Sequence, residues 1–382
     1  MPGIYKALTF FLVSKTYGTS ILGELASWQA IAQIAGYFTA IGWSTLILVR
    51  IPRSSNKEER VDVFNRLTSM GTYTLIIALA ILTITGLVTN EKKSCFQIGL
   101  WLSAWTYYQI PRHYFISLKE YRKALTLDST VIILSVVSLL APEDRASAFL
   151  AMSMLSVGIF SIMVIKNFKL NYISPKAYEI KGLEFGLANM LGGGVSLTLI
   201  PLSSYFEGAK FAGELSLFIS ITAISLLVPR AISLNQLPQI SNSLENPKLL
   251  EELIPILRKN TRASNIATSI FCIAIIILMA SSPKEHHSLT AICAYLLIAI
   301  QNAINIESSI DATLLMAKEK SKQSLQINMH VSLIYFAITS WIYIQRSTYS
   351  FILVCILITI LSLYRLHKTR HFAKLAYSNI KQ

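Results

Sequence analysis

The sequence predicts an all-α polytopic membrane protein of about twelve transmembrane helices in two six-helix lobes. Its 382 residues are 53% hydrophobic and only 14% charged, whereas soluble domains carry about 25% charged residues. The apolar residues come in blocks of roughly 18 to 25, the length that crosses a bilayer as a helix. Each block must be helical because unpaired backbone amides in hydrocarbon cost several kcal/mol. The third observation is a set of short motifs that recur in the second half, which indicates two copies of one unit.

The apolar blocks follow one another along the chain as far as residue 366. The first block is short, because Lys6 interrupts it and Tyr17-Gly18 ends it. It is not a signal peptide, since a basic segment and a cleavage site do not flank it. The twelve expected spans cover residues 4–17, 25–49, 67–89, 96–116, 125–141, 146–165, 185–205, 212–235, 265–282, 289–308, 325–345 and 349–366.

Lysine and arginine are distributed unevenly between the loops on the two sides of these spans. Of the 34 such residues, 27 lie on the side that carries both termini and 7 on the other side. Basic loops stay in the cytoplasm, so both termini are expected there. The loops on the opposite side are all short. The loops also account for the formal net charge of +14, and nucleic-acid binding is not expected.

Three short matches occur in the same order in both halves, although chance similarity between leucine-rich helices is an alternative explanation. They pair Gly23-Glu24-Leu25 with Gly213-Glu214-Leu215, Pro52 with Pro238, and Leu118-Lys119-Glu120 with Ala317-Lys318-Glu319. Six spans in each half give two lobes of the same sense, related by an axis along the membrane normal. The expected domains are an N-terminal lobe over 1–165, a cytoplasmic linker over 166–184, a C-terminal lobe over 185–366 and a basic cytoplasmic tail over 367–382.

Neither a cofactor nor a metal is expected. The four cysteines form no Cys-x-x-Cys pair and three of them lie in apolar blocks, which is not typical of a metal site or a disulfide framework; they are Cys95, Cys272, Cys293 and Cys355. The loop over 236–262 is amphipathic, and a helix on the membrane surface is expected there. Its leucines at helical spacing are Leu249, Leu250, Leu253 and Leu257.

Four segments at the ends of expected helices carry a family resemblance. They read Lys15-Thr-Tyr-Gly-Thr-Ser-Ile-Leu-Gly-Glu24, Arg50-Ile-Pro-Arg53, Phe115-Ile-Ser-Leu-Lys-Glu-Tyr-Arg122 and Leu315-Met-Ala-Lys-Glu-Lys320. With them the chain resembles the O-antigen flippases, the polysaccharide-transport branch of the multidrug/oligosaccharidyl-lipid/polysaccharide (MOP) exporter superfamily. The resemblance covers nearly the whole chain through loose motifs. It departs at the N-terminus, where members usually carry a longer stretch before the first helix ends.

The resemblance implies a MATE-like arrangement of two lobes around a central cavity, in the bacterial inner membrane. The implied activity is not enzymatic. It is the flipping of polyprenyl-diphosphate-linked oligosaccharide by alternating access, for O-antigen, capsule or exopolysaccharide synthesis. The lipid tail can stay in the bilayer, but the anionic head must cross about 30 Å of hydrocarbon. The implied partners are this substrate, the lipid bilayer, and the polysaccharide polymerase and chain-length machinery.

Four basic residues are the candidate substrate-binding groups. Lys15 lies at the outer end of the first span, and Arg112 follows Pro111 among aromatic residues of the fourth span. An arginine suits a phosphate because its guanidinium binds two oxygens at once. Arg50 and Arg230 end the second and eighth spans in corresponding places. Anchoring at the membrane interface is the alternative explanation for each of them.

Four acidic residues are the candidates for ion coupling or for pairing with an arginine. Glu24 opens the second span, where capping of a helix N-terminus is the other explanation. Asp128 is expected near the cytoplasmic start of the fifth span, and Glu307 and Asp311 lie four residues apart near the end of the tenth. Ionisable groups within a span are costly unless they face a cavity or a partner.

Glycines in the seventh span are the expected hinge. Gly192, Gly193 and Gly194 are followed by Pro201, and alternating access needs a segment that bends. Close helix packing is the alternative explanation.

Two other functional classes stay open, beside a structural role in a glycan-assembly complex without transport. A cation-coupled exporter of small molecules from the same superfamily would carry a carboxylate deep within a span, whereas the acidic candidates lie nearer to span ends. A membrane-embedded glycan polymerase or ligase would need a large external loop, and the short loops argue against it.

Overall fold

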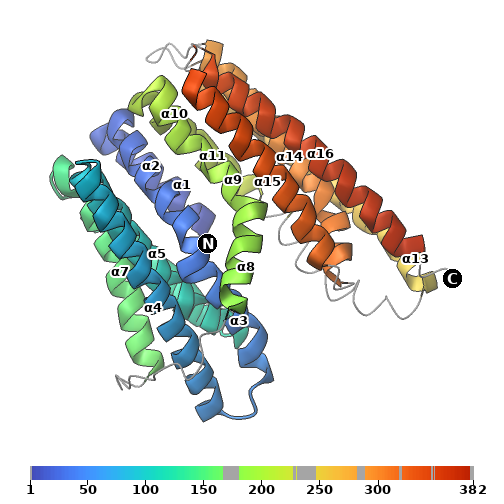
Figure 1. Cartoon of the computed structure of the whole chain (residues 1–382), viewed down its shortest axis with the longest axis horizontal. Helices are drawn as coiled ribbons and strands as arrows, with labels where there is room; N and C mark the ends of the chain where they lie inside the picture. Colours follow the sequence, from blue (N-terminus) through green and yellow to red (C-terminus); the bar gives the residue numbers. More distant parts are fainter. Residues whose placement is uncertain are drawn as a thin grey trace. The chain divides into compact units, whose positions relative to one another are not determined.

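A computed structural model of the chain describes residues 2–166, 180–226, 229, 247–281, 289–317, 321–345, 347 and 349–378. These residues form helices and short connections, without a strand among them (Figure 1). Eight of their helical segments are long and apolar enough to cross a membrane. The predicted fold class, a polytopic all-α membrane protein, is therefore confirmed. Contacts group the chain into two compact units, residues 1–213 and residues 214–382.

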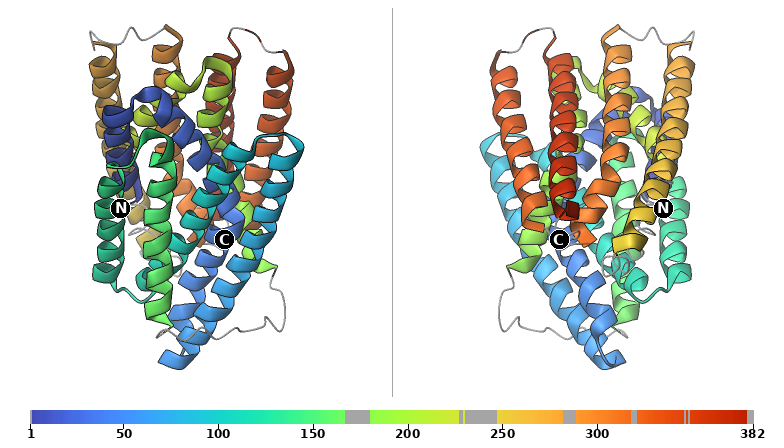
Figure 2. Two further views of the ribbon diagram at one scale, coloured as in Figure 1. Left: turned by 90° about the vertical axis from the view of Figure 1, so that its left-hand side faces the viewer. Right: turned by 90° about the vertical axis from the view of Figure 1, so that its right-hand side faces the viewer.

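The first unit consists of helical rods that run alongside one another (Figure 2). Two of the rods contain a π-helical turn, in which the helix is wider because each hydrogen bond spans one residue more than in an α-helix. The elements are α1 (Pro2–Tyr17), α2 (Thr19–Gly36), η1 (Tyr37–Ile41), α3 (Gly42–Arg50), η2 (Ile51–Arg53), α4 (Lys57–Val88), α5 (Lys92–Ser117), α6 (Tyr121–Ser138), η3 (Glu143–Arg145), α7 (Ala146–Ile165), α8 (Lys181–Asn189), η4 (Met190–Gly194), α9 (Val195–Leu197), α10 (Leu199–Glu207) and the start of α11 (Ala209–Ser225).

Helix α5 is the centre of the first unit, and it packs against α2, α3, α4 and α7. Buried polar side chains join it to its neighbours. The Trp101 indole donates to Ser147 on α7 over 3.1 Å, and the Thr39 and Thr106 hydroxyls lie 2.7 Å apart between η1 and α5. Without a hydrophobic force between helices in lipid, such hydrogen bonds and close packing hold a bundle together.

The two halves of the sequence meet in the first unit around one reciprocal contact. A Cβ atom at Gly23 would lie 1.7 Å from the Ala209 carbonyl oxygen, and one at Gly213 would lie 1.9 Å from that of Thr19. Each of these pairs joins residues of the two halves, and exchanging the halves turns one pair into the other. Reciprocal contacts of this kind are produced by a local twofold axis, as the sequence repeat leads us to expect.

The turns that precede these helices are also alike. Gly18 has φ 91° and ψ 169° between α1 and α2, and Gly208 has φ 93° and ψ 167° between α10 and α11. Only glycine adopts such a left-handed extended conformation readily. Both glycines stand five residues before the glycine of the reciprocal contact, so the repeat extends to the backbone of the turn.

The second unit contains most of α11, followed by α13 (Pro247–Ala280), α14 (Leu289–Ala317), α15 (Ser321–Gln345) and α16 (Ser350–Ser378). Helix α14 packs against α13, α15 and α16. The rings of Phe218 and Tyr295 stack at 4.7 Å between α11 and α14. Helix α16 runs on through residues 367–378, which were expected to form a tail.

Each expected span overlaps a helix or a run of helices. The surface helix expected over 236–262 is wrong for its described part, because residues 247–262 are the first half of α13. The apolar side chains of that half, Leu253, Ile254 and Leu257, pack against Ile310, Leu314, Leu315, Phe372 and Ala373 of α14 and α16. The described leucines of this face thus pack against protein.

The contact boundary at residue 213 differs from the linker expected over 166–184. The reason is that α8 packs against α3 and α10 against α2, so these helices group with the first unit. Contacts show which helices touch, but they do not show which helices belong to the same repeat. The division into lobes over 1–165 and 185–366 therefore stays a prediction.

Candidate functional site

Helices α5 and α6 bring together three of the polar side chains of the first unit. The Nε atom of Arg112 lies 3.0 Å from Oδ1 of Asp128, and the Tyr108 hydroxyl donates to the same oxygen. Tyr108 and Arg112 stand four residues apart on α5, so they share one face of the helix. The Asp128 side chain is 3% exposed and that of Arg112 is 15% exposed. We call these three residues the buried cluster.

Asp128 lies deeper in its helix than the sequence indicated. It is the eighth residue of α6, which begins at Tyr121 and ends at Ser138. The carboxylate is buried against α5, and its expected place near the cytoplasmic start of the span stays a prediction. A buried carboxylate is stable only when it is paired and hydrogen-bonded, and the two contacts from α5 supply that pairing.

Local features of α5 explain how the cluster is positioned. Pro111 lies inside the helix, where it has no amide hydrogen to donate and frees the carbonyl group four residues earlier, that of Tyr107. At this level α7 approaches α5 closely, since a Cβ atom at Gly158 would lie 2.6 Å from the carbonyl carbon and oxygen of Tyr107. The His113 ring is held by the Gln109 carbonyl oxygen, 2.8 Å from its Nδ1 atom.

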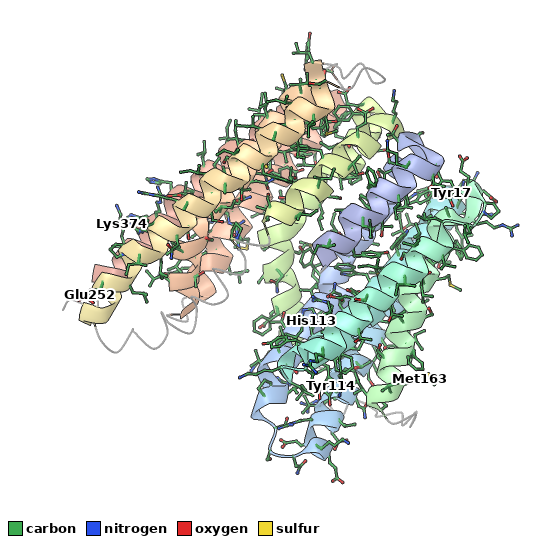
Figure 3. All side chains as sticks on the ribbon, turned by 180° about the vertical axis from the view of Figure 1, so that it is seen from behind. Tyr17, His113, Tyr114, Met163, Glu252 and Lys374 are labelled. Carbon is green, nitrogen blue, oxygen red and sulfur yellow. The ribbon has the colours of Figure 1, made fainter. Side chains whose placement is uncertain are left out.

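Figure 3 shows where this region lies in the first unit. His113 and Tyr114 of α5 and Met163 of α7 are labelled toward one end of the rods, and Tyr17 of α1 toward the other. The Tyr114 ring lies 4.7 Å from that of Phe64 on α4, so the aromatic residues around Arg112 are used for packing between helices.

The second unit holds another arginine–carboxylate cluster, formed by α13, α14 and α16. Glu307 and Asp311 stand one turn apart on α14. Arg370 of α16 reaches both, with Nη2 2.7 Å from Glu307 Oε1 and Nε 3.5 Å from Asp311 Oδ2. Arg258 of α13 lies 3.2 Å from Asp311, and Arg262 lies 3.6 Å from Glu307. We call these five residues the clasp, because they join three helices.

The remaining basic candidates lie apart from one another. Lys15 is exposed in the last turn of α1, with Nζ 5.8 Å from the centre of the Phe11 ring. Arg50 is half-buried in the last turn of α3. The rod from α2 to α3 begins just after Lys15 and ends at Arg50, and at 1.5 Å per residue its ends are about 45 Å apart. Arg230 lies outside the described residues.

The end of α1 is fixed near Lys15. The Tyr17 hydroxyl lies 2.7 Å from the Leu139 carbonyl oxygen and 2.8 Å from that of Ala141, so it donates to the connection between α6 and α7. Glu24 is exposed and is the sixth residue of α2. The alternative that it caps the N-terminus is wrong, because the helix begins at Thr19 and has no acidic residue in its first turn.

The glycines expected to form a hinge lie in the π-helical turn η4, and Pro201 is the third residue of α10. The turn faces the other π-helical turn, η1, through Tyr37. A Cβ atom at Gly193 would lie 2.9 Å from the Tyr37 hydroxyl oxygen, and one at Gly194 would lie 3.3 Å from its ring. Wide turns at corresponding heights of two packed rods are weak points in both, and the hinge stays a prediction.

Close backbone contacts also join α8 to α3 and to η1. A Cβ atom at Gly42 would lie 1.9 Å from the Gly182 carbonyl oxygen, and one at Gly186 would lie 2.6 Å from the Tyr37 carbonyl oxygen. Together with the reciprocal contact of Gly23 and Gly213, these contacts pack α2 and α3 against helices from the second half of the sequence at two places along their length.

Comparisons with known proteins place this fold. No family model matches the sequence, and no curated protein matches it. Among solved structures, the chain is similar to the lipid II flippase MurJ in an inward closed conformation, with a TM-score of 0.74 and 13% identity over 97% of this chain and 85% of that one. It is also similar to a multidrug resistance MATE family transporter of the MOP superfamily in an outward-facing conformation, with a TM-score of 0.58 and 14% identity over 99% of this chain and 96% of that one.

A third similar structure is a MOP superfamily transporter from Pyrococcus furiosus, with a TM-score of 0.58 and 13% identity over 99% of this chain and 92% of that one. At these identities the similarity shows the fold. The chain therefore has the fold of the MOP superfamily transporters.

Proposed function

We propose that the protein is a flippase that moves polyprenyl-diphosphate-linked oligosaccharide repeat units across the bacterial inner membrane, for O-antigen, capsule or exopolysaccharide synthesis. The observation that carries the proposal is the similarity in fold to the lipid II flippase MurJ over 97% of the chain. The proposed mechanism is alternating access between the two lobes with both termini in the cytoplasm, and it makes no covalent bond.

The buried cluster supports the handling of an anionic head group. Among the described residues, Arg112 contacts Asp128 through Nε, which leaves the two Nη groups for a phosphate. A guanidinium binds two phosphate oxygens in parallel. Because a charge is costly in hydrocarbon, an anion that crosses the membrane needs partners at several depths. Lys15 and Arg50 at the two ends and the paired Arg112 on α5 are the proposed partners.

The test is to delete the gene and to measure which face of the inner membrane carries the lipid-linked oligosaccharide. Accumulation on the cytoplasmic face, reversed by the intact gene, is the expected result. Repeat units that reach the outer face normally and are not polymerised would contradict it, and would favour a polymerase or ligase. An unchanged distribution with normal surface polysaccharide would contradict both.

A cation-coupled exporter of small molecules is the second candidate, and one observation favours it. Such an exporter needs a carboxylate within a span, and Asp128 is buried in the middle of α6. Under this proposal the deletion leaves lipid-linked oligosaccharide unchanged and slows the efflux of a cationic dye along an imposed proton or sodium gradient.

A further inference from the structure

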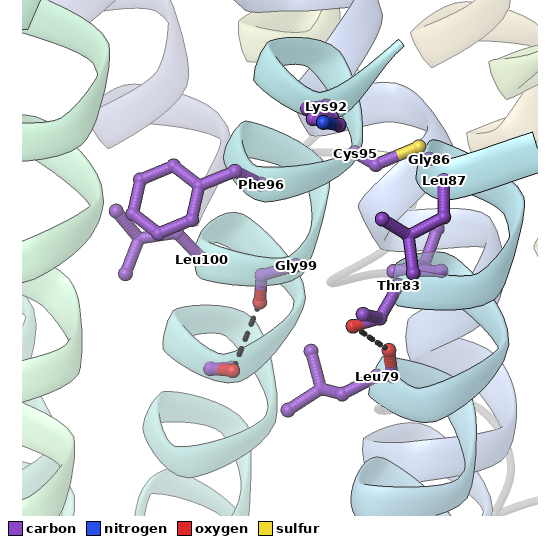
Figure 4. A pocket seen from close by; sticks show the side chains of 11 residues that line it. Leu79, Thr83, Gly86, Leu87, Lys92, Cys95, Phe96, Gly99 and Leu100 are labelled. Atoms are coloured by element: carbon purple, nitrogen blue, oxygen red, sulfur yellow. Dashed lines mark hydrogen bonds between the residues drawn. The ribbon is translucent and has the colours of Figure 1, made fainter. Parts of the chain in front are cut away.

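A groove of about 430 Å³ lies between α4 and α5, and its lining does not include the residues of the buried cluster (Figure 4). Its walls carry large apolar side chains, and Leu87 and Phe96 are 64% and 65% exposed. Gly86 and Gly99 are buried in its floor. The two helices approach closely at these glycines, because a Cβ atom at Gly86 would lie 3.0 Å from that of Cys95 and one at Gly99 would lie 3.1 Å from Cδ2 of Leu79.

The interior of the groove suits a hydrocarbon chain. Its two hydroxyl groups already donate to the backbone of their own helices, Thr83 to the Leu79 carbonyl oxygen over 2.8 Å and Ser103 to that of Gly99 over 2.9 Å; both bonds are dashed in Figure 4. A polar ligand would find few unused donors there, whereas an apolar chain covers leucine and phenylalanine side chains without stranding a polar group.

The end of the groove offers a positive charge. Lys92 is exposed at the first residue of α5 and lines the groove. The ion pairs of the described residues do not include it, and the neighbouring Glu91 carboxylate accepts from the Ser94 hydroxyl at 3.2 Å. The N-terminus of α5 has no side-chain cap, so its first amide hydrogens also favour an anion.

The length of the groove matches one leaflet of a bilayer. The stretch of α5 that lines it runs from Lys92 to Ser103, which is about 16 Å at 1.5 Å per residue. Half of a hydrocarbon core of roughly 30 Å is nearly the same. A lipid whose head group meets Lys92 would therefore lie with its chain along the whole groove.

We propose that this groove binds one anionic phospholipid of the bilayer, with its phosphate on Lys92 and an acyl chain between Leu79 and Leu100. The charge of the lysine and the uncapped helix end select an anionic head group. The apolar interior and its one-leaflet length select a lipid chain. The proposal is independent of what the protein transports.

The experiment uses the two half-buried free thiols, Cys95 in the groove and Cys293 on α14. The full chain is purified in detergent and titrated with phosphatidylglycerol or phosphatidylcholine. The rate at which a maleimide modifies each thiol is then measured by peptide mapping. The matched variants are Lys92→Gln and Lys93→Gln, because Lys93 is an exposed neighbour that does not line the groove.

Phosphatidylglycerol should slow the modification of Cys95 and leave that of Cys293 unchanged, at concentrations where phosphatidylcholine has little effect. Its half-protecting concentration should rise about fivefold in Lys92→Gln, the ratio that corresponds to about 1 kcal/mol per basic residue at an anionic surface. Lys93→Gln should behave as the wild type.

Equal protection by the two phospholipids, or equal half-protecting concentrations for the two variants, would overturn the proposal. Polyprenyl phosphate is the competing ligand. If it protects Cys95 at lower concentrations than phosphatidylglycerol does, the groove belongs to a polyprenyl lipid and the assignment to a bilayer phospholipid is wrong.

Discussion

Replacing one partner of the Arg112–Asp128 pair should destabilise the first unit more than replacing both. In Arg112→Met the Asp128 carboxylate, 3% exposed, loses its counter-charge. In Asp128→Leu the guanidinium is left without a carboxylate. Removing one member of a buried ion pair costs about 3–5 kcal/mol. The double variant leaves no buried charge, and the Tyr108 hydroxyl that loses its acceptor costs about 1–3 kcal/mol.

These free energies translate into measurable shifts of the unfolding temperature. For a unit of this size, 1 kcal/mol corresponds to roughly 2–4 °C, so each single variant should lose about 6–20 °C. The two effects should be non-additive by about 2 kcal/mol or more, because the residues touch. Tryptophan fluorescence suits the measurement, because four of the five tryptophans, Trp28, Trp43, Trp101 and Trp105, lie in the first unit.

An exposed pair at the start of α6 provides the control. Lys123 and Glu120 are paired at 3.0 Å with side chains 61% and 36% exposed, and such pairs contribute at most about 1 kcal/mol. Lys123→Met should therefore shift the unfolding temperature by no more than a few degrees. The reasoning is refuted if Arg112→Met shifts it no further than this control, or if the double variant equals the sum of the singles.

Three further predictions concern other contacts. Gly158→Leu should abolish the folded protein in detergent, measured by size-exclusion chromatography, because its side chain would enter the backbone of α5; wild-type yield would contradict the close approach. Arg370→Gln should destabilise the second unit more than Arg262→Gln, measured by thermal unfolding, since Arg370 reaches both carboxylates and Arg262 only Glu307; equal losses would speak against the clasp. Lys15→Ala should reduce surface polysaccharide at unchanged protein level, because Lys15 is exposed and the ion pairs of the described residues do not include it; normal polysaccharide would remove it from the proposed path.

The helices of this fold could be predicted from the sequence because the length of an apolar block is itself the signal. The continuity of α13 was also readable, since neither glycine nor proline occurs between Pro255 and Ala280. The loop interpretation failed because amphipathic spacing shows only that one face is covered. It does not say whether lipid or neighbouring helices cover it.

The sequence does not show which arginine pairs with which carboxylate. The sequence shows Arg112 and Asp128 each as a costly charge within a span, but their contact depends on how α5 and α6 are rotated about their axes. Arg370 lies in the expected basic tail over 367–382, where the sequence indicates no partner for it. The four-residue spacing shared by Glu307 and Asp311 and by Arg258 and Arg262 was the available signal for the clasp. A weaker signal was available for the close approach of α7 to α5. Gly158 is a lone glycine in an apolar span, and small residues let helices approach closely.

The reciprocal contact between Gly23 and Gly213 has a consequence for how such a chain can arise. A surface that meets its own copy across a twofold axis is the interface of a symmetric dimer. A half-length chain carrying this surface would associate with a second identical half through the same glycine, before any covalent joining of the two. The full-length protein holds this interface within one polypeptide, where each glycine is limited sterically by a carbonyl group of the other half, that of Ala209 or that of Thr19.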